Sequence, residues 1–218
     1  MPRLPRVMVE GIPFHVTHRG NHKKNVFDED ADRRSYVDLL RGYATRFEML
    51  IWGYSLMSNH VHLVVVGRSR NSIPRAVGNA HREFSRRRNR TQAVTGHLWA
   101  NRYFSTVLDE PHLWAAIRYI ELNPVRAGIV DDATAFEWSS ARAHAALADS
   151  DLLDPDRPFP GPIGDWRQWL ANGLEDETLN RLRANTASGA PTGDDAFVET
   201  IERRLNRRVR ALRRRTGS

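Results

Sequence analysis

The sequence predicts an α+β fold, in which an antiparallel sheet carries helices on one face and a mainly helical, basic extension follows. Two observations support this. Apolar residues alternate in some segments and recur at helical spacing in others, in the order strand, helix, strand, strand, helix, strand. Beyond about residue 146, prolines and then arginines become frequent. We therefore expect a folded domain over residues 1–146, a proline-rich strap with short helices over 147–193 and a basic helix or tail over 194–218.

Four segments have the composition of strands. Residues 13–19 (PFHVTHR) mix β-branched and aromatic residues and run into Gly20-Asn21, which predicts a turn. Residues 50–57 and 60–66 flank only two residues, Ser58-Asn59, and this spacing predicts a hairpin. A shorter strand is expected over residues 103–108.

The helices have equally clear signals. Residues 30–47 place apolar side chains at helical spacing, and residues 73–88 form a basic helical segment. A further helix begins after Asp109, a good N-cap, and should end at Asn123-Pro124, because proline disfavours helical geometry in the residue before it. Together with the strands, this order is the split βαβ arrangement of ferredoxin-like folds.

The C-terminal part should contain less regular structure. Asp151 to Pro162 holds four prolines, which predicts an extended strap, and Trp166, Trp169 and Leu170 should pack back on the domain. We expect a short helix over residues 175–183, a loop of small residues over 186–193 and a basic helix over 194–215.

Charge points to nucleic acid as a partner. The chain has 33 Lys+Arg against 26 Asp+Glu, a formal net charge of +7, and arginine clusters in two places. Guanidinium groups bind phosphates through two hydrogen bonds and stack on bases, although such clusters also occur on solvated helix faces. The candidate nucleic-acid contacts are Arg19, Arg82, Arg86, Arg87, Arg88, Arg102, Arg207 and Arg208.

Two absences narrow the class of protein. There is no cysteine, which excludes disulfides, thiolate metal sites and a cysteine nucleophile. The sequence has neither an apolar run long enough to cross a bilayer nor a secretory signal, so we expect a cytoplasmic protein with no membrane partner.

His60 and His62 are the strongest candidates for chemistry. Two residues apart on a strand, they project from the same face and can converge on one cation. Tyr119 and Asn123 share a helix face in the same way. Taken alone, the histidine spacing is as compatible with a structural pair as with a metal site, and a helical tyrosine usually packs its ring.

Taken together, the two pairs suggest a reaction. A tyrosine hydroxyl with a pKa of about 10 is a poor nucleophile at neutral pH unless its target is polarised. A metal bound by the histidine pair would polarise a phosphodiester, and the Asn123 amide oxygen would complete the protein ligands. Tyr103 is a second candidate nucleophile. Trp99, Tyr103 and Phe104, beside Arg102, could stack on unpaired bases, or could equally be core aromatics.

Several motifs resemble those of one family. The run YSLMSNHVHLV (54–64) resembles the signature strand of the HUH-type Y1 transposases, the IS200-like superfamily, and RYIELNPVRAG (118–128) resembles their nucleophile helix. PFHVTHRGN (13–21) and WANRYF (99–104) fit two further motifs, so the resemblance covers roughly residues 1–145. In detail the chain is most similar to the REP-associated tyrosine transposases, which act on repetitive extragenic palindromes.

The resemblance implies roles for particular residues. His60 and His62 would be the metal pair, Asn123 the third ligand and Tyr119 the nucleophile. It implies an endonuclease and strand-transferase on hairpin-forming single-stranded DNA such as REP-like palindromes, through a 5′-phosphotyrosine intermediate that leaves a free 3′-OH. The metal would be Mg²⁺ or Mn²⁺, and the two imidazoles favour Mn²⁺, because Mg²⁺ prefers oxygen ligands.

Other interpretations remain open at this stage. Residues 183–215 resemble a tail of the REP-associated proteins, but the chain lacks their Gly-Arg-Pro-type ending. A domesticated protein that binds a DNA hairpin without cutting it is the alternative function, and an HUH replication initiator or relaxase is a third. We expect a monomer, with a dimer as the alternative.

Overall fold

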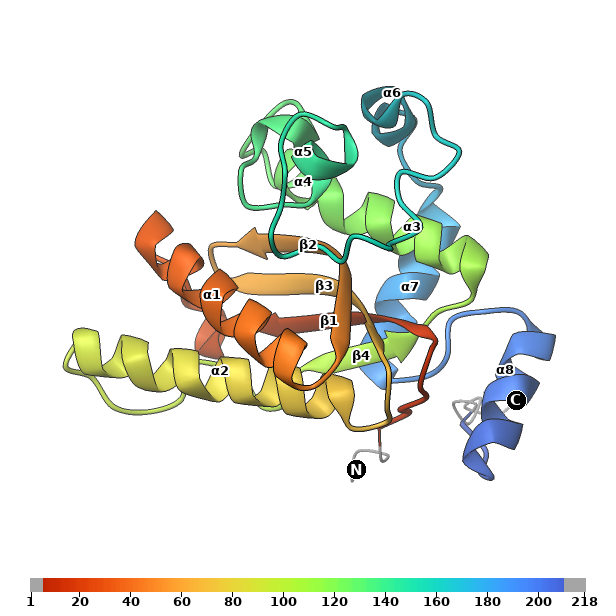
Figure 1. Ribbon diagram of the computed structural model, residues 1–218, viewed down its shortest axis with the longest axis horizontal. Helices are drawn as coiled ribbons and strands as arrows, with labels where there is room; N and C mark the ends of the chain where they lie inside the picture. The colour runs from red at the N-terminus through yellow and green to blue at the C-terminus, as the bar shows by residue number, and fades with distance from the viewer. Residues whose placement is uncertain (1–5, 210–218) are drawn as a thin grey trace, which may run out of the picture.

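The computed structural model describes residues 6–209, and its centre is one four-stranded sheet (Figure 1). The strand order is β2-β3-β1-β4, and every neighbouring pair is antiparallel. The strands are β1 (Pro13–Arg19), β2 (Met49–Met57), β3 (His60–Gly67) and β4 (Phe104–Val107). The order and directions confirm the predicted ferredoxin-like split βαβ sheet.

The β2–β3 hairpin places the histidine pair in the middle of the sheet. Only Ser58 and Asn59 separate the strands, as predicted. In the register, His60 lies opposite Met57 on one side and Arg19 on the other. Both edges of β3 are therefore hydrogen-bonded to neighbours, which makes it a stiff support for side chains at its start.

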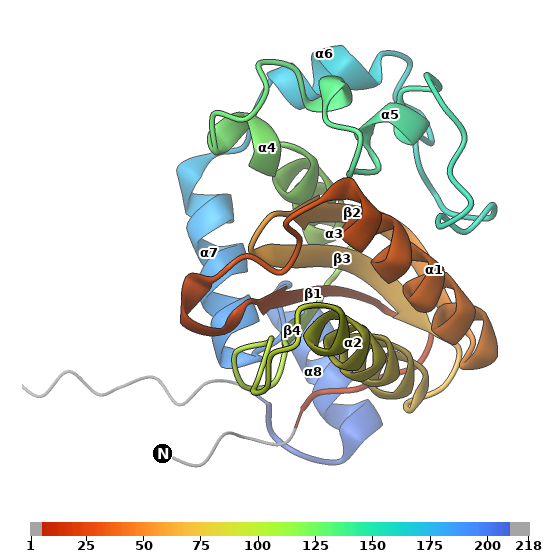
Figure 2. The ribbon, with the colours of Figure 1, turned by 90° about the vertical axis from the view of Figure 1, so that its left-hand side faces the viewer.

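Helices cover both faces of the sheet, as the side view in Figure 2 shows. α1 and α2 lie on one face, whereas α3 and α7 lie on the other. Their bounds are Asp30–Arg46 for α1, Ser72–Thr91 for α2, Glu110–Glu121 for α3 and Asp176–Ser188 for α7. The two helices of the split βαβ unit, α1 and α2, therefore share one face as predicted, and the later helices α3 and α7 cover the other face.

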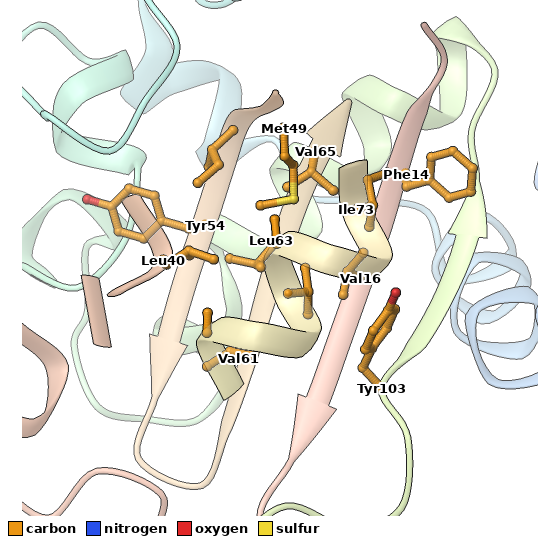
Figure 3. Close-up of a cluster of buried hydrophobic side chains, with 14 of the residues drawn as sticks. Phe14, Val16, Leu40, Met49, Tyr54, Val61, Leu63, Val65, Ile73 and Tyr103 are labelled. Atoms are coloured by element: carbon orange, nitrogen blue, oxygen red, sulfur yellow. The ribbon is translucent and has the colours of Figure 1, made fainter. Parts of the chain in front are cut away.

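The sequence of β3 explains why both faces are covered. Val61, Leu63 and Val65 join the core under α1 and α2, part of which Figure 3 shows, whereas Val64 joins a second core with α3 and α7. All four side chains are fully buried. A strand that is apolar on both sides must be covered on both sides, because either face left bare would expose apolar surface to water.

The remaining helices are short and belong mainly to the C-terminal half. They are the 3₁₀ turns η1 (Asn21–Lys23) and η2 (Ala133–Ala135), and the α-helices α4 (Asn123–Arg126), α5 (Ala141–His144), α6 (Trp166–Ala171) and α8 (Asp195–Leu205). Trp166 and Leu170 are buried and Trp169 is partly buried against the same core, which confirms that this segment packs back on the domain.

Two C-terminal predictions need correction. α7 continues through Thr186 to Ser188, where a small-residue loop was expected, and ends at Gly189 in the left-handed conformation (φ 82°). α8 ends at Leu205, because Asn206 is also left-handed (φ 50°), rather than continuing toward Arg215. The arginines from 210 onward lie outside the described residues.

The segments that were predicted as separate parts of the chain pack on one another in the described residues. α7, from the predicted strap, packs on β4 and α3, and α8 contributes Val198 and Ile201 to the core under α1 and α2. No helix in residues 6–209 is long and apolar enough to span a bilayer. The boundaries at 146 and 193 stay a prediction.

Candidate active site

His60 and His62 lie close together at the start of β3. Their ring centroids are 4.9 Å apart and the ring planes are nearly perpendicular, at 83°. His62 is 5% exposed, and His60 is partly buried at the rim. Desolvation by burial lowers the pKa of His60 to about 4, with a contribution from the Arg19 charge, and lowers the pKa of His62 well below its usual value. Both imidazoles are therefore neutral near pH 7.

Each histidine uses its Nδ1 atom within the protein. His60 Nδ1 lies 2.5 Å from the amide oxygen of Asn59, which can only accept, so His60 Nδ1 carries the proton. His62 Nδ1 lies 2.9 Å from Nε2 of His15. In the described part of the chain neither Nε2 atom has a hydrogen-bond partner, and a neutral imidazole with one free nitrogen is a good metal ligand.

His15, on β1, is a site residue that the sequence did not reveal. Its ring stacks on His62 with centroids 5.1 Å apart and planes 7° apart, and burial lowers its pKa to about 3. His15 and His18 lie on opposite faces of β1, because His15 contacts His62 whereas His18 contacts His81 of α2. The register that brings His15 beside His62 is a long-range property of strand pairing.

Tyr119, on α3, packs against the two stacked histidines. Its ring is edge-on to His62, with centroids 5.4 Å apart, and to His15, at 5.8 Å. The guanidinium carbons of Arg126 and Arg183 lie 4.4 and 5.5 Å from the centre of its ring. The predicted juxtaposition of the tyrosine with the histidine pair is thus present, and Tyr119 is 8% exposed.

Asn123 lies just beyond the break between α3 and α4. α3 ends at Glu121 with Leu122 as its C-cap, and Pro124 occupies the first turn of α4, so the helix is interrupted where the proline predicted it. Asn123 Oδ1 accepts a hydrogen bond of 2.8 Å from Arg126, whose guanidinium also binds the Tyr119 carbonyl. The Asn123 Nδ2 atom is buried with no partner among the described residues.

The donor set at this site fits a divalent ion. Residues 6–209 contain no cluster of three His, Asp or Glu side chains that could hold a metal, so the histidine pair needs a third protein ligand of another type. The Asn123 amide is such a group, because its carbonyl oxygen keeps a second lone pair besides the one used by Arg126. The two free Nε2 atoms and this amide are the groups that were predicted as ligands, and their role in binding a metal stays a prediction.

The predicted nucleic-acid contacts fall into two groups. Most are exposed, among them Arg82, Arg86 and Arg87 on α2, Arg19 and Arg102 near the strand ends, and Arg208. Arg207 is partly buried and donates to the Arg6 carbonyl. Arg88 is 6% exposed and binds the carboxylates of Asp28 and Asp32 at 2.5 and 2.7 Å, which corrects its assignment as a phosphate contact.

The predicted base-stacking aromatics lie mainly in the core. Trp99 and Tyr103 are 7% and 5% exposed, and only Phe104 is partly accessible. Tyr103 packs edge-on against His18, with ring centroids 6.3 Å apart, and belongs to the core under α1 and α2 that Figure 3 shows, whereas Tyr119 belongs to the core on the other face. Burial raises the pKa of its hydroxyl. Tyr103 is therefore poorly placed to act with the histidine pair.

A buried carboxylate anchors the helix that carries Tyr119. Glu121 is fully buried and accepts hydrogen bonds from Ser140 (2.5 Å), His144 (2.6 Å) and the indole nitrogen of Trp166 (2.7 Å). These bonds join α3 to α5 and α6, and they hold the end of α3 two residues beyond Tyr119.

A second histidine pair lies on the opposite face of the sheet. His18 Nδ1 and His81 Nδ1 are 2.8 Å apart, and His81 Nε2 is 2.8 Å from the Tyr36 hydroxyl. Desolvation lowers the pKa of His18 to about 4, with a smaller effect of Arg6, and lowers the pKa of His81 well below its usual value. The Asn101 carbonyl oxygen lies 3.3 Å from His18 Nε2, and this contact raises the pKa of His18, which opposes part of the lowering.

This pair should make folding sensitive to acid. Unfolded histidines bind protons below pH 6.5, whereas folded His18 stays neutral until about pH 4 and the pKa of His81 is also held well below its usual value. The free energy of unfolding should therefore fall as the pH falls below 6.5. Each histidine contributes about 1.4 kcal/mol per pH unit. Urea unfolding at pH 7 and pH 5 should show a shallower pH slope for His81→Asn than for the unmodified chain. Equal slopes would contradict this account.

The fold and the site together define a ferredoxin-like α+β protein in which a His-x-His pair on a central strand faces a helical tyrosine. The chain belongs to the family of IS200-like transposases, whose model matches residues 8–123, just over half of the chain. Family membership indicates a transposase-like function and DNA as the partner. No curated protein matches the chain.

Two solved structures are similar. One is described as a REP-associated tyrosine transposase bound to a REP hairpin; it is 14% identical, with a TM-score of 0.55, and the match covers 75% of this chain and 100% of that one. The other, a candidate transposase from Deinococcus radiodurans R1, is 21% identical, with a TM-score of 0.40, and the match covers 55% of this chain and 96% of that one. At these sequence identities, the match to the first structure supports the fold of this chain, and the match to the second is too weak to add to it.

Proposed function

We propose that the protein is a metal-dependent endonuclease and strand-transferase that acts on hairpin-forming single-stranded DNA, with Tyr119 as its nucleophile. The observation that carries the proposal is the packing of Tyr119 edge-on against His62, 5.4 Å between ring centroids, beside two histidines whose Nε2 atoms are free. A buried tyrosine that only filled space would not need neutral imidazoles beside it.

The proposed step is a phosphoryl transfer. The Tyr119 hydroxyl gives up its proton and its oxygen attacks a backbone phosphorus, so that a P–O bond to the tyrosine forms and the bond from phosphorus to the 3′ oxygen breaks. That oxygen takes up a proton and leaves as a free 3′-OH, while the 5′ phosphate stays on the protein. Because the bond energy is kept in the phosphotyrosine, a 3′-OH can reverse the step and rejoin a strand.

The chain provides ligands for the metal that this step requires. His60 and His62 would bind Mg²⁺ or Mn²⁺ through Nε2, and Asn123 through its amide oxygen. When bound, the ion supplies polarisation of the phosphate and stabilisation of the charge that develops on it. Two nitrogen ligands in a set of three favour Mn²⁺ over Mg²⁺.

The DNA path is proposed from the exposed guanidinium groups. Arg183 is exposed and lies 5.5 Å from the Tyr119 ring, so it is suited to hold the phosphate that reacts. Arg82 and Arg86 line a groove of about 330 Å³ together with Asn89 and His97. Arg19, Arg87, Arg102, Arg207 and Arg208 remain proposed contacts. A REP-like hairpin is the proposed substrate, in line with the ligand described for the similar structure, and the protein is proposed to act as a monomer.

An adduct assay tests the function. The full-length protein is incubated with Mn²⁺ and a hairpin oligonucleotide that has single-stranded flanks, labelled at either its 5′ or its 3′ end. Denaturing gels should show the 3′ label attached to protein and the 5′ label released on a shorter fragment, because the 5′ phosphate stays on the tyrosine. Chelation with EDTA should abolish both signals. A hairpin that is bound in native gels but never gives an adduct would instead indicate a DNA-binding protein without cleavage activity.

A further inference from the structure

A chain of buried hydrogen bonds runs from α7 to His62. Thr186 Oγ1 lies 2.7 Å from the Leu182 carbonyl oxygen and 2.9 Å from His15 Nδ1. His15 Nε2 in turn lies 2.9 Å from His62 Nδ1. Thr186, His15 and His62 are 4%, 1% and 5% exposed, so water does not compete for these bonds.

Only one arrangement of protons satisfies the whole chain. A carbonyl oxygen can only accept, and two oxygens 2.7 Å apart need a proton between them, so Thr186 donates to Leu182. Thr186 must then accept from His15, which places the single proton of that imidazole on Nδ1. His15 Nε2 is therefore an acceptor, and His62 must donate to it from Nδ1.

The alternative arrangement requires a buried charge. If His15 carried a second proton, it would donate to His62 and move the His62 proton to Nε2, the nitrogen needed by a metal. His15 is 1% exposed, and both of its described hydrogen-bond partners, Thr186 and His62, are uncharged. A buried imidazolium with no anion beside it is strongly disfavoured.

We propose that Thr186, acting through His15, is a positioning residue that keeps the His62 proton on Nδ1 and so leaves the Nε2 lone pair of His62 available to a metal. This inference rests on the proposed function, which places a metal at His60 and His62. Hydrogen bonds of this kind orient metal-ligating histidines and set their tautomer.

The two ligands are held in different ways. His60 donates to its own neighbour, Asn59, in the β2–β3 turn. His62 depends on Thr186, which lies 171 residues from His15 along the chain and outside the segment matched by the family model. The proposed metal site therefore depends on the packing of the C-terminal helix α7 beside His15.

The first test is the tautomer itself, in the metal-free protein. Long-range ¹H–¹⁵N spectra of the imidazole rings at pH 7 should show His15 and His62 protonated on Nδ1 and bare on Nε2. In Thr186→Val, which keeps the β-branched shape but removes the acceptor, the populations of the two tautomers should shift for both rings. A His62 proton found on Nε2 in the unmodified protein would overturn the inference.

The second test is the affinity for Mn²⁺ alone, measured by titration calorimetry. Thr186→Val should weaken it roughly tenfold, the usual effect of losing such a supporting hydrogen bond, and Thr186→Ser, which restores the hydroxyl, should recover it. Thr192→Val is the matched control: Thr192 is fully buried and its hydroxyl bonds Thr106 of β4, the sheet partner of His15, but within residues 6–209 it makes no hydrogen bond to a histidine.

The possible outcomes distinguish a failure of this inference from a failure of the proposed function on which it rests. Unchanged Mn²⁺ affinity in Thr186→Val, or an equal loss in Thr192→Val, would overturn the role of Thr186. If the unmodified protein bound no Mn²⁺, the proposed metal site would fail, and the tautomer spectra would still decide whether Thr186 and His15 hold the His62 proton on Nδ1.

Discussion

Tyr119→Phe is expected to abolish the covalent protein–DNA adduct while hairpin binding and fold persist. The substitution removes only the hydroxyl, and the phenyl ring keeps its contacts with His62, His15 and Arg126. Because no other described tyrosine lies against the histidine pair, the rate should fall on the order of 10³-fold or more, to the background of the assay. The measurement is the yield of denaturant-resistant adduct with Mn²⁺ and a labelled hairpin.

Tyr103→Phe provides the matched control. Its hydroxyl is buried on the other face of the sheet, and in the described part of the chain it has no hydrogen-bond partner, so its removal should change neither adduct yield nor binding. Native gels should show equal hairpin affinity for both variants. An adduct that survives in Tyr119→Phe, or one that disappears in Tyr103→Phe, would refute Tyr119 as the nucleophile.

Glu121→Ala is expected to cause the largest loss of stability. Three donors, Ser140, His144 and Trp166, lose their acceptor in a site with no exposure to water. Breaking a buried polar pair of this kind costs about 3–5 kcal/mol, a large share of the roughly 5–15 kcal/mol that holds a typical domain together. The urea midpoint should fall accordingly, with the slope of the transition unchanged.

Glu137→Ala tests whether this loss is specific to the buried carboxylate. Glu137 is exposed in the same C-terminal half, so its removal should shift the free energy of unfolding by less than about 0.5 kcal/mol. A loss of under 1 kcal/mol in Glu121→Ala would show that the three donors find water or other partners. The helix end beyond Tyr119 would then not depend on this carboxylate.

Local patterns in the sequence were sufficient to predict most of the sheet and to select the candidate site residues. The bounds of β1 agree with the prediction, and those of β2 and β3 agree within one residue, because alternation and two-residue turns are local signals. The placement of His60 and His62 on one face of a strand is also a local feature, and so is the separation of Tyr119 and Asn123 by about one helical turn. Each depends only on the period of one strand or one helix.

The sequence contains a signal that both faces of the sheet are covered. Leu63 to Val66 is a continuous apolar run, and such a run is typical of a strand buried on both sides. Thr186 also follows Leu179 and Leu182 at helical spacing, the stripe that α7 buries. The small residues around Thr186 concealed this period and suggested a loop.

Residue types, order and spacing therefore determined the fold class, the histidine pair and the candidate nucleophile. Only the tertiary structure decided that His15 and Thr186 support His62, that Glu121 holds His144 and Trp166, and that Arg88 is buried with two carboxylates. Each of these contacts joins residues that are far apart in the chain. Periodicity tells which face of its own element a residue occupies, whereas the partner on that face depends on how separate elements pack.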